Sequence, residues 1–158
     1  MKYVDLDGRA GETTGVIDPR PYLEHLPEFA DRLPPGARAF ATDPGHYAFS
    51  GARCVKDLRP DLARRTAADE VELRFRHDCF KHEEDLVIRY RGVSRFQAGF
   101  LGACDVSGLG EVILDEVLPR PDGGCSHEIA CRPGTLFVVC RDLTASWVPA
   151  DCPETPGS

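Results

Sequence analysis

The clearest pattern in this chain is an alternation of hydrophobic and polar residues that begins at Val71. The odd positions up to Cys79 are apolar except for His77, and the even positions up to Asp78 are all charged. Successive side chains of a β-strand point to opposite faces of the sheet. The alternation therefore predicts a strand whose odd-numbered residues, His77 included, face the interior. A buried imidazole needs a hydrogen-bond partner, so we expect one for His77.

Further alternating runs predict more strands. Residues 85–93 complete a β-hairpin with the first run, so that one hairpin spans residues 71–93. A second hairpin is expected over residues 126–143, because Pro133-Gly134 suits a type II turn between its two runs. Strands are also expected at residues 95–101 and 111–118. Together these runs predict a mainly antiparallel sheet of about five to eight strands.

The first forty residues have a different character. Residues 8–15 are polar and contain glycine, which predicts a loop. An apolar stripe at helical spacing follows, formed by Tyr22, Leu26, Phe29 and Leu33. We expect a short N-terminal helical segment, interrupted at Pro27, that packs on the sheet and covers the run 136–140, which is apolar on both faces.

These elements predict an α+β fold. We expect one globular domain over residues 1–148 and a flexible, Pro/Gly-rich tail over residues 149–158. The polar segment 61–69 predicts a short helix or a loop.

Charge limits the partners that the chain would bind. Its 158 residues carry a formal net charge of −7, which disfavours nucleic acid and anionic membrane surfaces. The cationic residues are sixteen arginines and three lysines, a bias typical of a GC-rich bacterial genome. Neither a signal peptide nor an apolar run of about twenty residues is found, so we expect a soluble cytoplasmic protein.

The seven cysteines include no C-x-x-C pair, which argues against a zinc ribbon or a thioredoxin-type site. Cys79, Cys131 and Cys140 fall on inward-facing positions, where a free cysteine acts as a small hydrophobe. A reducing cytosol is the simplest setting for such thiols. The chain has no P-loop, G-x-S-x-G, G-x-G-x-x-G or H-E-x-x-H motif, and we expect no cofactor.

One candidate site is an inward-facing polar set. His77, Tyr90, Glu116 and His127 each share strand parity with apolar residues. If their strands form one sheet, the four groups would converge and could perform acid–base catalysis, or His77, Glu116 and His127 could bind a divalent metal. The alternative is structural, with each group bonded to a local partner. A metal set that includes His82 is disfavoured, because His82 falls in a charged hairpin loop.

The other candidate site is the outer face of the first hairpin. A register that sets Phe75 opposite Tyr90 also sets Arg76 opposite Arg89 and Arg74 opposite Arg91. Like charges directly opposed across strands are destabilising, so this cluster needs either carboxylate neighbours or an anionic partner.

We therefore expect a non-enzymatic binding or inhibitor-type module that recognises an acidic protein or a small anion through these arginines. The alternative is a small enzyme, or a ligand- or metal-binding protein, with an interior His/Glu/Tyr pocket. The sequence does not indicate an oligomeric state.

Overall fold

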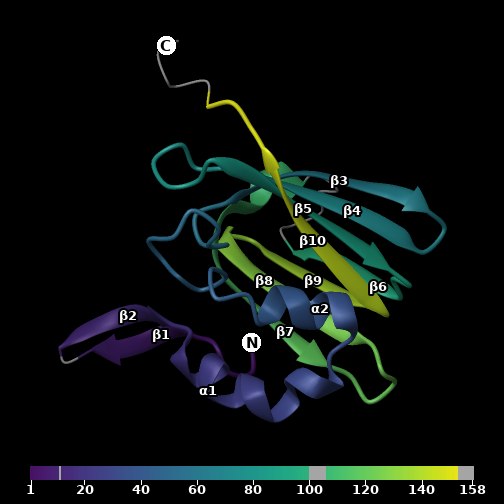
Figure 1. Cartoon of the computed structure of the whole chain (residues 1–158). Coiled ribbons are helices and arrows are strands. Elements are labelled where there is room, and N and C mark those ends of the chain that lie inside the picture. The colour runs from purple at the N-terminus through teal and green to yellow at the C-terminus, as the bar shows by residue number, and fades with distance from the viewer. Residues whose placement is uncertain (11, 100–105, 153–158) are drawn as a thin grey trace.

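Two antiparallel four-stranded sheets, stacked face to face, form the body of the protein (Figure 1). The computed structural model describes residues 1–10, 12–99 and 106–152. Sheet 1 has the strand order β10-β5-β4-β3 and is formed by β3 (Arg59–Ala67), β4 (Glu70–Arg76), β5 (Glu84–Arg91) and β10 (Asp142–Pro149). Sheet 2 has the order β6-β9-β8-β7 and is formed by β6 (Arg95–Gly99), β7 (Gly110–Pro119), β8 (Cys125–Pro133) and β9 (Thr135–Cys140).

The remaining elements flank this sandwich. A separate two-stranded sheet is formed by β1 (Asp5–Ala10) and β2 (Thr13–Asp18). It is followed by helix α1 (Arg20–Phe29), the 3₁₀ turn η1 (Ala30–Arg32) and helix α2 (Pro35–Ala41), and a second 3₁₀ turn, η2 (Val106–Leu109), precedes β7. No helix within the described ranges is long and apolar enough to cross a bilayer.

Alternating strands produce the core. On β4 the buried residues are Val71, Leu73 and Phe75, and His77 continues this side just beyond the strand, with 7% of its surface exposed. On β8, His127, Ile129 and the neighbouring inward positions are likewise buried. The two predicted hairpins are therefore confirmed as β4–β5 and β8–β9, and the prediction that His77 is buried is also confirmed.

The described chain has more strands than predicted, ten rather than about five to eight. In the segment 8–15, expected to be a loop, residues 8–10 and 13–15 belong to strands β1 and β2, so the helices are not the first elements of the chain. The segment 61–69, expected to be a helix or loop, belongs mostly to β3. Most of β3 is exposed, so the hydrophobic alternation that reveals a half-buried strand is missing from it.

The predicted strand 135–143 was also wrong in its extent. Strand β9 ends at Cys140 in sheet 2, and β10 begins at Asp142 in sheet 1. The chain thus crosses from one sheet to the other within two residues. Residues 149–152 are the last described, and the predicted tail beyond them, 153–158, lies outside the described residues.

The helices pack beside the sandwich, with α2 against β10 (Figure 1). The backbone N–H groups of Gly36 and Ala37, at the start of α2, donate to the Asp142 carboxylate at 3.2 and 2.9 Å. A side chain at Gly36 would place its Cβ 1.9 Å from the carbonyl oxygen of Leu143, so this close approach requires glycine.

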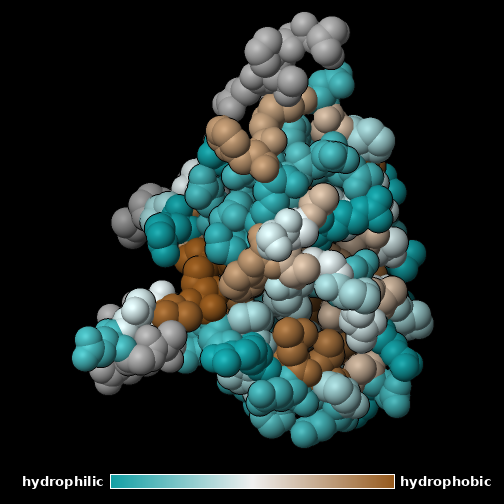
Figure 2. Space-filling model, turned by 60° about the vertical axis from the view of Figure 1, so that its left-hand side comes forward, coloured by the Kyte–Doolittle hydropathy of each residue, from teal (hydrophilic) through white to brown (hydrophobic). Residues whose placement is uncertain are grey.

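The β1–β2 hairpin projects from the body, and Figure 2 shows hydrophobic surface at its base. There Leu6 and Ile17 pack against the core as partly buried residues. Among the strand residues of this hairpin whose burial is described, only Gly8 is fully buried, which explains why the alternation gives no sign of the hairpin.

Glu116 of β7 fixes the N-terminal segment. Its carboxylate, in a residue only 2% exposed, accepts the backbone N–H groups of Lys2, Tyr3 and Val4 at 2.7, 2.6 and 2.8 Å. Three backbone donors are thereby satisfied by one side chain, which holds residues 2–4 against β7.

We predict that Glu116→Gln destabilises the fold by about 2–4 kcal/mol, because one oxygen is replaced by an amide that cannot accept a hydrogen bond. Urea denaturation measures the change. Glu111 lies on the same strand, its side chain is 53% exposed, and Glu111→Gln is the matched control. The control should cost less than about 1 kcal/mol. Equal losses in the two variants would contradict this role for Glu116.

Candidate functional site

The four arginines of the predicted binding face lie on the outer face of sheet 1, but not in the predicted register. Phe75 pairs with Leu86 rather than with Tyr90, and Arg89 lies opposite Glu72. The reason is the connection between the strands. Strand β4 ends at Arg76 and β5 begins at Glu84, so the turn consumes more residues than a tight hairpin would. No arginine of β4 therefore opposes an arginine of β5.

Carboxylates are shared between arginines on this face. Glu72 bonds Arg64 of β3 at 2.8 Å and Arg89 of β5 at 2.9 Å. Hydrogen bonds from Arg89 and Arg64 outweigh partial burial and hold the pKa of the Glu72 carboxyl below its usual value. Asp85 likewise contacts Arg74 at 2.9 Å and lies 3.8 Å from Arg76.

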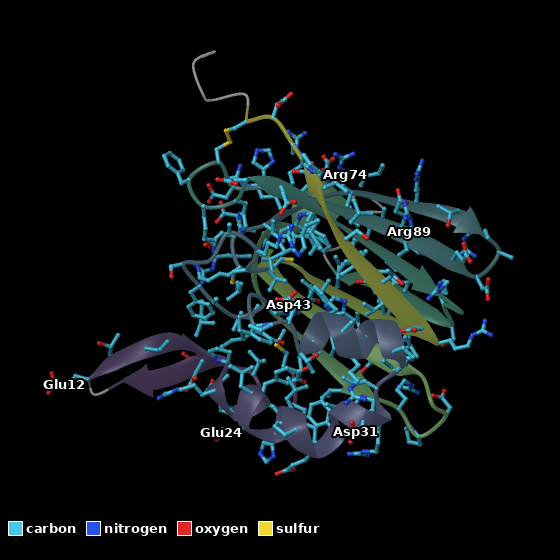
Figure 3. The ribbon with its side chains drawn as sticks, in the orientation of Figure 1. Glu12, Glu24, Asp31, Asp43, Arg74 and Arg89 are labelled. Carbon is cyan, nitrogen blue, oxygen red and sulfur yellow. A yellow bond between two sulfur atoms is a disulfide. The ribbon has the colours of Figure 1, made fainter. Side chains whose placement is uncertain are left out.

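We call the set Arg64, Arg74, Arg76, Arg89 and Arg91 the arginine face. Their side chains remain 44–66% exposed in spite of these contacts. Figure 3 labels Arg74 and Arg89 on sheet 1. Two arginines share each of the central carboxylates Glu72 and Asp85, and Arg91 lies opposite Glu70 and 3.9 Å from Asp142. The five guanidinium groups thus outnumber these four carboxylates by one, on a chain of net negative charge.

The interior polar set is assembled differently from the prediction. The Tyr90 hydroxyl is 2.8 Å from Nδ1 of His127, and Nε2 of His127 is 2.7 Å from Oδ2 of Asp115. The other oxygen, Oδ1 of Asp115, is 2.6 Å from Nε2 of His46, whose Nδ1 is 2.9 Å from the carbonyl oxygen of Phe40. None of the four linked residues is more than 2% exposed.

A β-bulge explains why Asp115 rather than Glu116 enters this network. The pairing of β7 with β8 shifts between Val112 and Leu114, which reverses the alternation beyond that point. Asp115 thus points into the sandwich, and Glu116 points to the outer side. Sequence parity counted from Val112 predicts that Glu116 is buried, which it is, but it lies beneath residues 2–4 rather than between the two sheets. His46 and Asp115 were missed, because nothing in the local sequence marks the bulge.

The predicted convergence of His77, Tyr90, Glu116 and His127 is therefore not observed. Only Tyr90 and His127 meet, and His77 bonds Asp85 elsewhere. The cavity beside Asp115 and His127 has a volume of about 10 Å³, enough for at most one water molecule. The network satisfies its own donors and acceptors and joins the two sheets to the 42–55 segment.

Electrostatics couple the members of this network. Burial would raise the pKa of Asp115, but His46 and His127 outweigh it and hold that pKa far below its usual value. Burial would lower the pKa of His46, but the charge and hydrogen bond of Asp115 outweigh it and raise that pKa. Each partner therefore favours the charged form of the other.

His77 forms a second His–Asp pair at the end of sheet 1. Its Nδ1 is 2.7 Å from Oδ1 of Asp85, and its backbone N–H donates to the same oxygen at 2.9 Å. Its Nε2 lies 3.6 Å from Sγ of Cys79, which forms a disulfide with Cys152. Cys79 was predicted to be an inward-facing free thiol. That was wrong, because β4 ends before it; Cys131 and Cys140 are free and buried, as predicted.

Only one group of described residues brings enough ligand atoms together for a metal ion. The ligand atoms of His77, Cys79 and Cys152 lie within 4.8 Å of one another. The two sulfurs are bonded to each other, however, so they are not available as thiolate ligands in this state. The alternative metal set His77, Glu116 and His127 is not brought together.

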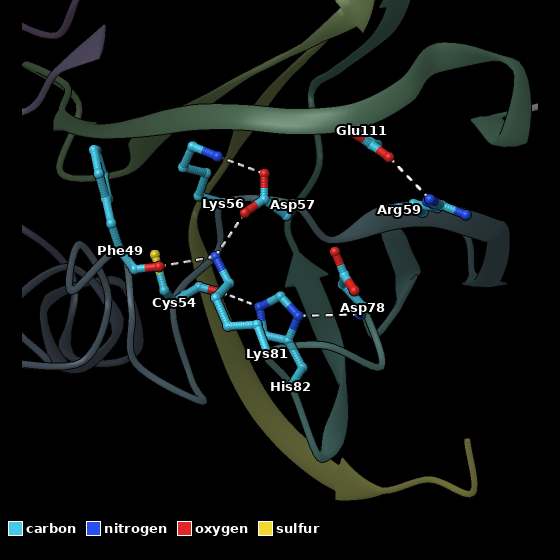
Figure 4. A network of polar contacts seen from close by, with 9 residues as sticks. All are labelled: Phe49, Cys54, Lys56, Asp57, Arg59, Asp78, Lys81, His82 and Glu111. Atoms are coloured by element: carbon cyan, nitrogen blue, oxygen red, sulfur yellow. Dashed lines mark hydrogen bonds and ion pairs between the residues drawn. The ribbon is translucent and has the colours of Figure 1, made fainter. Parts of the chain in front are cut away.

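The loop that carries Cys79 is held by a polar network (Figure 4). Nζ of Lys81 donates to the carbonyl oxygen of Phe49 at 3.1 Å and to Asp57 at 2.8 Å, and Nε2 of His82 is 2.8 Å from the carbonyl oxygen of Cys54. His82, expected in an exposed turn, is only 3% exposed. The 78–83 loop is thus fastened to the 49–57 segment rather than free in solvent.

Comparison with known proteins adds no assignment: no family model matches the sequence, and no curated protein is significantly similar to it.

We predict that His46 gives the fold a pH dependence. Because its folded-state pKa is raised, its contribution to stability is fully present below about pH 6.5 and is lost as the pH rises through the raised value. The melting temperature of the wild type should fall as the pH rises above about 6.5, and this fall should be smaller in His46→Gln. His25→Gln, at a half-exposed histidine, is the control and should leave the profile unchanged. Thermal unfolding at a series of pH values measures this dependence of the melting temperature on pH. Parallel profiles for the wild type and His46→Gln would contradict the prediction.

Proposed function

We propose that this chain is a non-enzymatic binding module that recognises an acidic protein surface through its arginine face. The observation that carries the proposal is the shared pairing on sheet 1, where two carboxylates each serve two arginines. The guanidinium groups are held in place by a sheet, and their hydrogen bonds to other described residues occupy only some of their N–H donors. Arginine is the side chain best suited to bidentate recognition of carboxylates.

The ion pairs of the face do not prevent binding. The arginine ends of these pairs are 44–66% exposed although their carboxylates are not, so a partner's carboxylates could contact the outward N–H groups without displacing Glu72 or Asp85. Glu72 is the more buried member of its pairs, with 13% of its side chain exposed, and it spaces Arg64 and Arg89 apart. The carboxylates thus order the arginines without removing them from solvent.

An acidic protein fits this surface better than the other anions do. The net charge of −7 repels a polyanion such as nucleic acid at long range. A small anion binds best in a concave site, whereas these arginines lie along one face of an open sheet. A protein surface of matching carboxylates would contact several of them at once.

We further propose a cytoplasmic location in a bacterium. Cys125 and Cys140 lie directly opposite each other, with their sulfurs 3.6 Å apart and unbonded, and Cys54 and Cys131 are free as well. Free thiols at such separations suit a reducing compartment. The arginine-rich, lysine-poor composition supports a GC-rich bacterial source.

We predict that Arg76→Gln/Arg89→Gln weakens binding to a fluorescent decaglutamate peptide at least about tenfold, because two guanidinium contacts are lost. Fluorescence anisotropy at low and high salt measures the affinity, and wild-type binding should weaken as salt is added. The melting temperature should stay within a few degrees.

The matched control is Arg20→Gln/Arg38→Gln, which removes the same charge from two exposed helix arginines that do not belong to the arginine face. It should bind as the wild type does. The proposal fails if the peptide does not bind the wild type, or if both double variants lose the same affinity. Displacement of the peptide by millimolar free glutamate would indicate a small-anion site instead.

A further inference from the structure

A cysteine pair, a histidine and an aspartate meet where sheet 1 ends. Cys79 follows β4, and Cys152 follows β10. Their disulfide joins the β4–β5 turn to the last described residues of the chain, and Figure 3 draws it as a yellow bond between sulfur atoms. Both cysteines are partly exposed, unlike the four free cysteines of the described chain, which are all buried.

His77 is oriented toward this disulfide from the protein side. Nδ1 faces Asp85, so the neutral imidazole carries its proton there and turns the lone pair of Nε2 toward Cys79 Sγ, 3.6 Å away. Asp85 is in turn fixed by Arg74 and by the backbone of His77. This is the arrangement of acid, imidazole and thiol that activates a cysteine nucleophile.

The charge state of Asp85 supports this orientation. Burial would raise the pKa of its carboxyl, but hydrogen bonds from His77 and Arg74 outweigh burial and lower that pKa. The Asp85 carboxylate thus holds the imidazole through Nδ1 with Nε2 toward Cys79, where a positive charge would stabilise a thiolate.

We propose that Cys79 and Cys152 form a redox-active pair that exchanges with dithiols and disulfides, with Cys79 as the reactive thiol and His77 as the group that activates it. The site is separate from the proposed binding function of the arginine face, although Arg74 and Asp85 connect the two.

The reduction requires a dithiol reductant. One thiol of the reductant gives its proton to Nε2 of His77, and the resulting thiolate attacks Sγ of Cys152 and forms a mixed disulfide. The Cys79–Cys152 bond breaks, and its electron pair leaves on Cys79 as a thiolate beside the newly protonated His77. The second thiolate of the same reductant molecule then attacks the reductant sulfur that is bonded to Cys152. Cys152 leaves as a thiolate and takes up a proton. The protein has gained two electrons and two protons, and the reductant has become a disulfide.

Access and rigidity both favour this chemistry. Phe80, next to Cys79, is 93% exposed, so the turn presents the cysteine toward solvent. At the same time Lys81 and His82 fasten the turn to the 49–57 segment. The imidazole–sulfur geometry would therefore persist after the disulfide opens.

The pH dependence of alkylation tests the role of His77. The protein is reduced with dithiothreitol, desalted and labelled with iodoacetamide from about pH 5 to pH 10, and peptide mass spectrometry assigns each labelled cysteine. Cys79 should reach half of its maximal rate at least about one pH unit below free glutathione measured alongside. His77→Gln should cut the Cys79 rate at pH 6 about tenfold and leave the rate at pH 10 unchanged, and His25→Gln should match the wild type.

A second arm tests the exchange step with oxidised glutathione as the probe. Reduced wild type should return to the intramolecular disulfide, whereas Cys152→Ser should accumulate one glutathione on Cys79. The proposal is overturned if Cys79 of the wild type follows the glutathione profile, or if Cys152→Ser acquires no glutathione. Should His77→Gln fail to fold, the wild-type profile and the Cys152→Ser result decide the matter.

Discussion

The fold depends on one buried charge, the carboxylate of Asp115. It is bound by His127 of the same sheet and by His46 of the segment that follows α2, and His127 reaches Tyr90 of the facing sheet. A buried charge is tolerated only when it is paired and hydrogen-bonded, and loss of one partner of such a pair costs about 3–5 kcal/mol. Because its partners come from different parts of the chain, Asp115 is satisfied only when sheet 2 and the 42–55 segment are in place, and Tyr90 joins this network to sheet 1 through His127. The network therefore selects this one arrangement of layers.

The chain thus uses hydrogen-bonded histidine–aspartate pairs in two different environments, around Asp115 and at Asp85. The imidazoles around Asp115 are sealed, with room for at most one water molecule beside them. The imidazole on Asp85 instead faces a partly exposed sulfur at the surface. The histidine–aspartate pairs around Asp115 stabilise the fold, whereas the pair at Asp85 supports the reactivity that we propose for Cys79. The two sites differ in their access to solvent. The exposed fraction of His77 does not distinguish the two sites, because His77 is as buried as many core residues.

Local periodicity was enough to predict part of this. The alternation from Val71 placed His77 and the β4–β5 hairpin, and the parity of His127 with Ile129 was correct. Register was not predictable, because the length of the turn after Arg76 depends on the contacts of Lys81 and His82 with a distant segment. The bulge before Leu114 reversed the faces of Asp115 and Glu116, and no local residue signals it. The pairing of Cys79 with Cys152 joins positions 73 residues apart, which sequence spacing cannot reveal.

Strand β3 lies at the open edge of sheet 1, where unpaired backbone groups could recruit a strand from another molecule. It carries Arg59, Arg64 and Arg65, all exposed. If the β3 strands of two molecules paired edge to edge, these guanidinium groups would lie close to one another, and their electrostatic repulsion would oppose the association. Arg64, which we also assign to recognition, would thus help to discourage self-association and fibril growth along this edge.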